Sequence, residues 1–487
     1  MRINNHTFFL LFIFLFILKS LSCDKHTKEQ WKSRSIYQIV TDRFAKSGVD
    51  SKIKCDDLTK YCGGTFKGIQ EKLDYIRGMG FDAIWISPPL KNKENSYHGY
   101  HNIDLYSINE NFGTENELKE LIKECHNRNI WVILDAVPNH MAGDLNISTF
   151  IPFNKEEYYH EACDVQENSS QEEKENCRIW GMPDLKQENE YVKNTLLNWL
   201  KDTIDNYGFD GVRYADVANV PKLFWKEFTE AADTYTLGIV SGNDIDYISD
   251  YQNYMDGVGD YPLYYAIRDS FCGSMLILEN YHKNIHNKYI NSNYNAIWLG
   301  NHDNKRFLNE CPYNNLLRNA IIFTFFYEGI PIFYYGDEQY FNGINEYDKH
   351  REVMFGYHDT SSDIYNLIKI ANEVRKSELI YEQNVKEVYA DEKIFAFTRG
   401  NVLIFVSNYK EEEINNDYIS IDFYELEKGE KLCNKLKKND CIVIQDRQIK
   451  IKLDGEPKLY AKEYKKDSNS KILSLYIYSL LLIILLI

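Results

Sequence analysis

The sequence lacks an excess of positive charge. Its 56 lysines and arginines are outnumbered by 73 aspartates and glutamates, which gives a formal net charge of −17 and a pI near 5.3. A nucleic-acid partner normally requires a basic protein face, so this balance argues against nucleic-acid binding. A large net charge of one sign keeps a protein soluble but does not indicate its fold.

The sequence also lacks internal repeats, and its apolar runs fall short of the 20 or so residues that a membrane-spanning helix needs. One such run covers residues 8–18, between Arg2 and a group of small residues that ends at Cys23. This is the pattern of a secretory signal peptide, and cleavage is expected after Ser22 or Cys23. We therefore predict that residues 1–23 are a signal peptide and that the protein is secreted, with an uncleaved anchor as the alternative.

The second apolar run lies at the carboxyl end. Residues 472–487 are apolar up to the last residue, and the small polar residues 467–470 precede them. Small residues before a terminal hydrophobic tail are typical of a signal for a glycosylphosphatidylinositol (GPI) anchor, although the polar spacer here is shorter than usual. A short tail anchor is the alternative. Either reading predicts a protein tethered to the membrane at the cell surface, with residues 462–471 as a charged stalk.

Ten cysteines suit an exported protein, because disulfides form in oxidising compartments. Three pairs are close enough in sequence to predict disulfides, namely Cys55–Cys62, Cys163–Cys177 and Cys433–Cys441. Cys125 falls on an amphipathic helical pattern and is expected to be buried. The pairing of Cys125, Cys272 and Cys311 is left open. Asn146 and Asn168 begin sequons that predict glycosylation in a secreted protein.

The body of the chain alternates strand and helix patterns. Apolar strand-like runs cover 81–88, 131–140, 209–216, 294–304 and 329–338, and helical patterns stand between them. Repeated units of this kind, with parallel apolar strands, predict a doubly wound sheet or a (β/α)8 barrel. Residues 141–190 break the rhythm, because they are irregular and acidic. After residue 384 only short strand patterns follow, which predicts a compact all-β domain.

In a (β/α)8 barrel the functional residues lie at the carboxyl ends of the strands. Those ends read Asp135-Ala-Val-Pro-Asn139-His140, Gly211-Val-Arg213 and Asn301-His302-Asp303-Asn304. With SIYQIVTDRFA (35–45), YHGYHNIDLYSIN (97–109) and GIPIFYYGDEQ (329–339), the chain resembles glycoside hydrolase family 13, and the fungal α-amylase group in particular, over about residues 30–410. The resemblance implies a TIM barrel over 24–140 and 191–383, a calcium-carrying B domain at 141–190 and a β-sandwich domain at 384–461.

Retaining hydrolysis of an α-glucan needs one carboxylate as nucleophile and a second carboxyl as acid/base, about 5–5.5 Å apart. In the family the nucleophile stands in the pattern Arg-x-Asp, but this chain reads Arg213-Tyr214-Ala215-Asp216. The resemblance therefore places Ala215 at the nucleophile position. Asp216 lies one residue further, and on a continuing strand its side chain would point to the opposite face.

The acid/base position departs from the family as well. Where the family has Gly-Glu-Val, this chain has Gly238-Ile239-Val240, so the resemblance places Ile239 there. Asp303 retains the third family carboxylate, which binds substrate hydroxyls. Asp244 and Asp246 follow in a predicted loop and are the available replacements for the missing acid.

Other residues match family positions that bind sugar or metal. The resemblance implies substrate contacts from Tyr100, His140, Arg213, His302 and Arg351. It also implies calcium ligands from Asn139, Glu175, Asp184 and the backbone carbonyl of Asn219. All four metal ligands are oxygen donors, as calcium requires.

Three functions follow from these residues. The first is a secreted, surface-tethered protein of α-amylase type that binds α-glucan or maltooligosaccharides of a cell wall and has lost hydrolysis. The second is an active α-amylase or 4-α-glucanotransferase that uses displaced carboxylates. The third is an interaction protein that needs only the fold. The retained Arg213, His302 and Asp303 favour the first two.

Overall fold

The structure is a computed structural model that describes residues 26–285, 288–343, 350–424 and 428–462. The predicted signal peptide and hydrophobic tail, and nearly all of the predicted stalk, lie outside these residues. Within the described part of the chain, no helix combines the length and the apolar character that crossing a bilayer requires.

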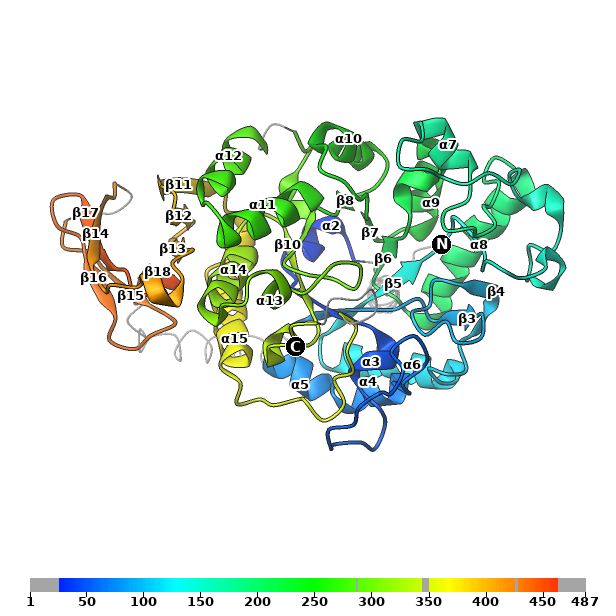
Figure 1. Cartoon of the computed structure of the whole chain (residues 1–487), viewed down its shortest axis with the longest axis horizontal. Helices are drawn as coiled ribbons and strands as arrows, with labels where there is room; N and C mark the ends of the chain where they lie inside the picture. The colour runs from blue at the N-terminus through cyan, green and yellow to red at the C-terminus, as the bar shows by residue number, and fades with distance from the viewer. Residues whose placement is uncertain (1–25, 286–287, 344–349, 425–427, 463–487) are drawn as a thin grey trace, which may run out of the picture.

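Eight parallel strands form the centre of the molecule (Figure 1). They are hydrogen-bonded in the order β8-β7-β6-β5-β2-β1-β10-β9. A single parallel bridge between Gly259 and Ala296 joins the two outermost strands, so the sheet nearly closes on itself. This arrangement confirms the predicted (β/α)8 barrel. The strands are β1 (Ile36–Ile39), β2 (Ala83–Ile86), β5 (Trp131–Ala136), β6 (Gly211–Tyr214), β7 (Tyr235–Gly238), β8 (Gly257–Val258), β9 (Ala296–Trp298) and β10 (Ile330–Tyr334).

Helices surround the barrel because each carries an apolar stripe that must be buried against the sheet. Their ends follow from local sequence. Thr114 and Glu117 form a capping box at the start of α6, and α8 ends where Gly208 adopts a left-handed φ of 81°. The helices are α2 (Lys28–Trp31), α3 (Thr41–Phe44), α4 (Phe66–Glu71), α5 (Leu73–Gly78), α6 (Glu115–Asn127), α8 (Glu190–Tyr207), α9 (Lys222–Ala232), α10 (Ile245–Asp250), α11 (Tyr261–Cys272), α12 (Leu276–Ile285), α13 (Phe307–Glu310), α14 (Asn314–Phe326) and α15 (Asp363–Ser377).

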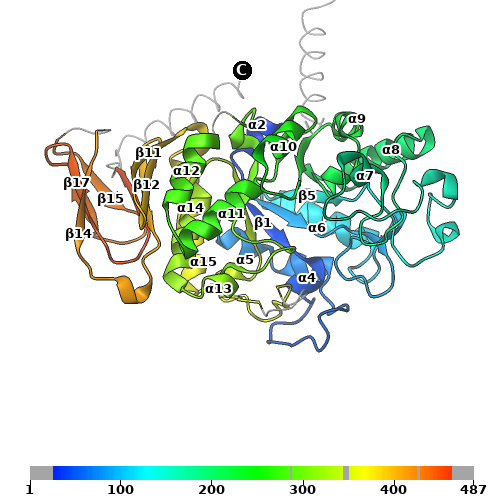
Figure 2. The ribbon, with the colours of Figure 1, turned by 45° about the horizontal axis from the view of Figure 1, so that its top comes forward.

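Residues 141–190 leave the barrel after β5 and return at α8. They hold only short elements, namely the 3-10 turns Ile147–Thr149 and Glu156–Tyr158 and the helix α7 (Gln171–Asn176). A hairpin of β3 (Leu90–Asn92) and β4 (Asn102–Ile108) lies beside them, joined to them by a parallel bridge between Asp104 and Ile151. In Figures 1 and 2 this group lies at the opposite end of the molecule from the carboxyl-terminal strands.

The carboxyl-terminal strands form two antiparallel sheets with a core between them. One sheet has the order β11-β12-β13-β18-β15-β16, and the other pairs β14 with β17. Side chains from both sheets, including Ile394, Leu403, Ile421 and Ile449, form this second core. The strands are β11 (Val385–Ala390), β12 (Ile394–Arg399), β13 (Val402–Ser407), β14 (Tyr418–Asp422), β15 (Lys431–Asn434), β16 (Cys441–Val443), β17 (Gln448–Lys452) and β18 (Lys458–Lys462).

The three predicted disulfides, Cys55–Cys62, Cys163–Cys177 and Cys433–Cys441, are present. A fourth joins Cys272, at the end of α11, to Cys311, just after α13. This pairing was open in the sequence because 39 residues separate the two positions. Cys125 is buried, as its helical pattern predicts, and its thiol, whose pairing the sequence left open, is free in the described part of the chain.

Candidate functional site

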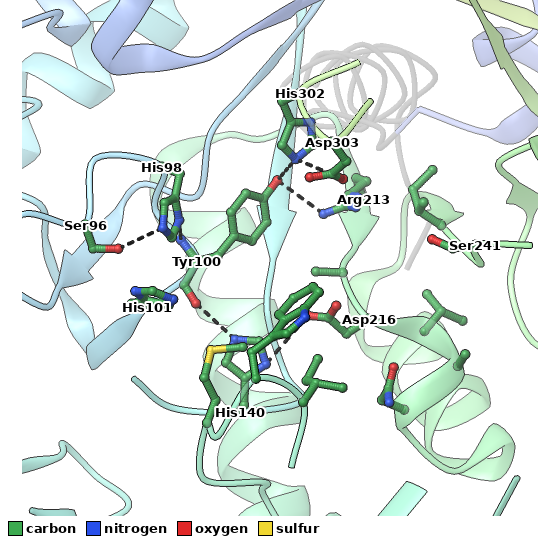
Figure 3. A pocket seen from close by; sticks show the side chains of 18 of the residues that line it. Ser96, His98, Tyr100, His101, His140, Arg213, Asp216, Ser241, His302 and Asp303 are labelled. Atoms are coloured by element: carbon green, nitrogen blue, oxygen red, sulfur yellow. Dashed lines mark hydrogen bonds and ion pairs between the residues drawn. The ribbon is translucent and has the colours of Figure 1, made fainter. Parts of the chain in front are cut away.

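A cavity of ≈ 860 Å³ opens at the carboxyl ends of the barrel strands (Figure 3). This is the end at which TIM barrels carry their functional residues. The structure brings into its lining every residue for which the sequence predicted a sugar-binding or catalytic position. These are Tyr100, His140, Arg213, Ala215, Ile239, His302, Asp303 and Arg351.

A buried carboxylate, Asp135, organises the floor of this cavity. Its side chain is 0% exposed, and one oxygen accepts a hydrogen bond from Nη1 of Arg213 at 2.9 Å. The other oxygen accepts from the hydroxyl of Tyr100 at 2.6 Å and from Nε1 of Trp85 at 2.9 Å. Asp135 belongs to a strand-end motif of the sequence, but no role was predicted for it. The sequence did hold a signal for such a role, because Asp135 stands inside an otherwise apolar strand and a buried charge needs polar partners.

His302 continues this network in one direction. Gln38 donates an amide N–H to Nδ1 of His302 at 2.6 Å, so the ring proton is on Nε2, which donates to the Tyr100 hydroxyl at 2.8 Å. The Tyr100 and His302 rings are stacked with centroids 5.4 Å apart. Burial lowers the pKa of His302 to about 3, so the ring is neutral at pH 7. Gln38 was not predicted as a site residue.

Asp303 is the carboxylate that this network presents to the cavity. Its side chain is 45% exposed and lies 3.4 Å from Nη2 of Arg351 and 3.5 Å from Nε2 of His302. Burial acts to raise the pKa of Asp303, but His302, Arg351 and Arg213 lower it below its usual value. Since His302 is neutral at pH 7, the guanidinium groups of Arg351 and Arg213 are the charges that favour the ionised form of Asp303 at this pH.

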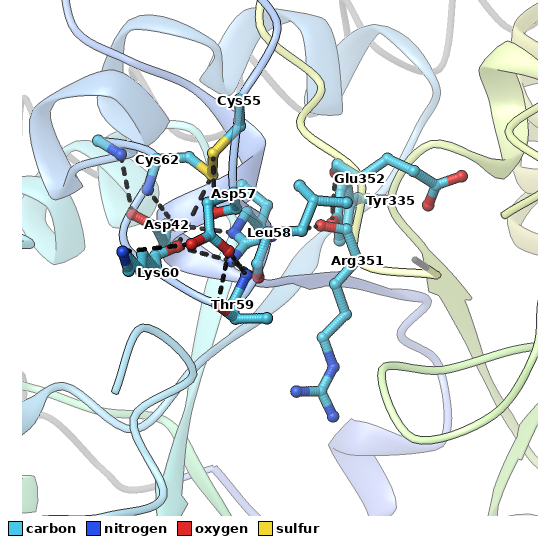
Figure 4. Close-up of a disulfide and its surroundings, with 12 residues drawn as sticks. Asp42, Cys55, Asp57, Leu58, Thr59, Lys60, Cys62, Tyr335, Arg351 and Glu352 are labelled. Atoms are coloured by element: carbon cyan, nitrogen blue, oxygen red, sulfur yellow. Dashed lines mark hydrogen bonds and ion pairs between the residues drawn. A yellow bond between two sulfur atoms is a disulfide. The ribbon is translucent and has the colours of Figure 1, made fainter. Parts of the chain in front are cut away.

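Arg43 connects Arg351 to the loop that the Cys55–Cys62 disulfide closes (Figure 4). The buried Arg43 donates to the carbonyl of Arg351 at 2.9 Å and to the carbonyls of Leu58 and Lys60 at 2.6 and 3.0 Å. The disulfide loop therefore supports a side chain that contacts Asp303.

Ala215 and Ile239 stand side by side at the ends of neighbouring strands. Tyr214 pairs with Gly238 in the β6–β7 ladder, and the amide of Ile239 donates to the carbonyl of Tyr214 at 3.3 Å. Nε of Arg213 is buried and has no hydrogen-bond partner among the described residues. Arg213 and Ala215 both line the cavity, so this unpaired donor lies on the side of position 215.

The expectation that Asp216 points away from the cavity is wrong. The strand ends at Tyr214, and Asp216 adopts left-handed backbone angles of φ 53° and ψ 38°, so the alternation of faces no longer applies. Its side chain lines the cavity, with one oxygen 3.6 Å from Nδ1 of His140 (Figure 3). Burial raises the pKa of Asp216 to about 6, and the nearby Asp303 adds to the increase.

The other predicted replacements lie elsewhere. Asp244 caps the start of α10, where it accepts from the amides of Asp246 and Tyr247. Asp246 pairs with Lys288. Neither is part of the cavity lining, so neither carboxylate is placed to act as the missing acid.

Three of the four predicted calcium ligands meet at one point. Nδ2 of Asn139 lies 2.8 Å from Oδ1 of Asp184 and 3.0 Å from the carbonyl oxygen of Asn219. Glu175 lies on α7, where it accepts from Gln171, which also contacts the carbonyl of Ala218. Among the described residues, no three histidine, cysteine, aspartate or glutamate side chains are grouped to hold a metal ion.

Fold and cavity together define a (β/α)8 barrel with its candidate site at the carboxyl ends of the strands. The family model described as the alpha-amylase catalytic domain matches residues 38–393, and the chain belongs to this family. It is therefore an α-amylase-like carbohydrate-processing protein.

Related sequences and structures match most of this chain. An alpha-amylase of Saccharomycopsis fibuligera is 33% identical over 458 residues, which cover 89% of this chain and 92% of the relative. Alpha-amylase 2 of Schizosaccharomyces pombe is 37% identical over 414 residues, covering 79% and 71%. Among solved structures, an alpha-amylase from Malbranchea cinnamomea superposes with a TM-score of 0.85 at 31% identity, covering 90% of this chain and 97% of that one. An alpha-amylase from Geobacillus thermoleovorans, complexed with acarbose, gives 0.80 at 31% identity, covering 90% and 99%.

Proposed function

We propose that this protein binds α-glucan chains in the barrel cavity and does not cleave them by the retaining mechanism. One observation carries this proposal. Ala215 and Ile239, where the resemblance places the family's nucleophile and acid/base, line the cavity beside the polar network of Arg213, Tyr100 and His302. A methyl group cannot attack an anomeric carbon, and an aliphatic side chain has no proton to donate to a leaving oxygen.

The remaining groups suit a neutral sugar. Arg213 and Arg351 present fixed guanidinium groups, Asp303 presents an acceptor, and Tyr100 presents an aromatic ring in the cavity wall. Convergent polar groups beside an aromatic surface are typical of a ligand site. The acarbose bound by the Geobacillus thermoleovorans relative supports a glucan-like ligand.

A second function rests on Asp216. Its carboxylate faces the cavity and carries a raised pKa, so it could serve as a displaced catalytic group in an active hydrolase or glucanotransferase. A two-carboxylate mechanism would then need Asp303 or Glu94 as the second group, since these are the other carboxylates in the described lining of the cavity. Binding without cleavage requires no such reassignment, and we prefer it.

Calcium fits the oxygen-rich junction between residues 141–190 and the barrel. Burial raises the pKa of Asp184 to about 6, although His160 and Asn139 act to lower it. The hydrogen bonds from these two side chains therefore do not fully offset the cost of burying the carboxylate charge. Oδ1 of Asn139 now lies 3.0 Å from Nδ1 of His140. Rotating the Asn139 amide by 180° would turn its oxygen toward Asp184 and the carbonyl of Asn219. The same rotation would turn its nitrogen toward Nδ1 of His140. Asn139, Asp184 and Asn219 would hold the ion, with Glu175 nearby, and the ion would supply positive charge that ties the insertion to the barrel.

Removing calcium is expected to destabilise the protein. Treatment with EDTA should lower the melting temperature, and added calcium should restore it, because a bound ion stabilises only the folded state. An Asp184→Asn variant should melt at the same temperature with and without EDTA. An unchanged melt of the wild-type protein in EDTA would contradict the calcium proposal.

Glucan binding can be measured directly. Isothermal titration with maltooligosaccharides should show binding to the wild-type protein, and the Asp303→Ala variant should lose it, because Asp303 is the half-exposed acceptor at the cavity floor. An Asp446→Ala variant is a matched control, since this exposed carboxylate pairs with Lys428 in the carboxyl-terminal domain. No heat from the wild-type protein at millimolar sugar would contradict the proposal.

We further propose that the protein is secreted and tethered at the cell surface. Four disulfides in the described residues support an oxidising compartment. The signal peptide and the anchor rest on residues 1–23 and 472–487 of the sequence.

A further inference from the structure

One tryptophan differs from all the others in its exposure. All seven tryptophans lie among the described residues, and six are at most 6% exposed. Trp180 is 82% exposed. The six buried tryptophans stabilise the fold through the apolar surface that they bury, and Trp180 contributes almost none of this. Packing therefore does not explain a tryptophan at position 180.

The backbone at Trp180 is unusual for a bulky residue. Trp180 has φ 51° and Gly181 has φ 72°, and the amide of Met182 donates to the carbonyl of Ile179 at 3.0 Å. Two left-handed residues within such a hydrogen bond form a type I′ turn, whose first central position favours glycine, asparagine or aspartate. A tryptophan there is strained, and strain of this kind gathers at functional sites.

This turn is anchored and borders the cavity. The Cys163–Cys177 disulfide lies just before it, and an isolated bridge between Asp164 and Arg178 joins the two segments of the loop. Trp180 forms part of the cavity wall, as do Tyr261 and Tyr265 from α11. The exposed ring is therefore held at the mouth of the cavity, while Arg213, only 5% exposed, lies deep inside it.

We propose that Trp180 is a stacking platform for a pyranose ring of a bound glucan, several sugar units away from the ring at Asp303. This inference rests on the proposed glucan binding and adds a preference for long chains. The apolar face of a pyranose can cover the indole ring, which gains the buried area that Trp180 lacks in the free protein. A short sugar held at Asp303 would not reach the platform.

Selective oxidation by N-bromosuccinimide tests this placement, because Trp180 is the single exposed tryptophan. Wild-type protein should show one fast-reacting tryptophan that maltoheptaose protects and maltose does not. In titration calorimetry, Trp180→Ala should weaken maltoheptaose binding about fivefold to tenfold and leave maltose binding unchanged. Trp180→Phe should retain most of the affinity.

A second variant separates stacking from folding. Trp180→Asn suits the left-handed turn, so it should melt at the wild-type temperature or higher and still lose the preference for maltoheptaose. Equal losses for both sugars, or no loss for maltoheptaose, would overturn the platform alone. Failure of the wild-type protein to bind either sugar would overturn the proposed function and this inference with it.

Discussion

Replacing Ala215 by Asp and Ile239 by Glu together is expected to give this protein an α-glucan hydrolase activity that, according to the proposed function, the wild-type protein lacks. The two positions directly follow Tyr214 and Gly238, which pair on neighbouring parallel strands, and such strands are about 4.8 Å apart. Carboxyl groups at these positions would fall near the separation of about 5–5.5 Å that retaining hydrolysis requires.

The surroundings favour both new side chains. The unpaired Nε of Arg213 lies on the side of position 215, where it could donate to the new aspartate. Ile239 is buried beside Trp298, and an apolar site raises the pKa of a glutamic acid, as a general acid needs. The rest of the polar network, including Asp303, is already in place.

A reducing-sugar assay on purified 24–466 is the measurement, because this range leaves out the predicted signal and tail. Each single variant should remain at least 10²–10⁴-fold below the double variant, since acid/base catalysis alone contributes about this much. Adding Asp303→Asn to the double variant should abolish the gain. Wild-type turnover that Asp216→Asn removes would instead show that the displaced carboxylate is catalytic.

Replacing Asp135 by Asn should cause a large loss of stability. The carboxylate is 0% exposed and accepts from Arg213, Tyr100 and Trp85. The amide would leave Arg213 buried without a hydrogen-bonded counter-charge and would set an N–H group against the Trp85 donor or the Arg213 donor. Breaking a buried ion pair in this way costs about 3–5 kcal/mol.

Chemical denaturation measures this loss. Glu115→Gln is the control, because it breaks an exposed ion pair with Lys119 and should change the free energy of unfolding by less than about 1 kcal/mol. Adding Arg213→Met to Asp135→Asn should recover part of the loss, since it removes the uncompensated charge. Equal effects of Asp135→Asn and Glu115→Gln would show that the network does not stabilise the barrel.

The barrel could be predicted from the sequence because five of its strands are apolar runs with helical patterns between them, and this pattern is local. The residues at the strand ends could be predicted to meet for the same reason, since parallel strands bring their carboxyl ends to one side. Three disulfides were predictable because their partners are at most 14 residues apart.

Other parts of the site could not be predicted. Gln38 and His302 are 264 residues apart, and their contact depends on closure of the barrel. Asp216 faces the cavity because β6 stops at Tyr214 and the backbone turns left-handed, a change that the flanking residues did not signal. Trp180 could not be distinguished from the buried tryptophans, because exposure depends on the packing of the whole chain.

The sequence by itself determined the family, five of the barrel strands and the identities of Ala215 and Ile239, because these depend on local patterns and on the order of residues along the chain. The tertiary structure alone decided that Asp135 supports Arg213 and Tyr100, that Nε of Arg213 has no partner among the described residues and that Asp216 turns into the cavity. Each of these depends on side-chain directions and on contacts between distant segments, which are fixed only when the barrel has formed.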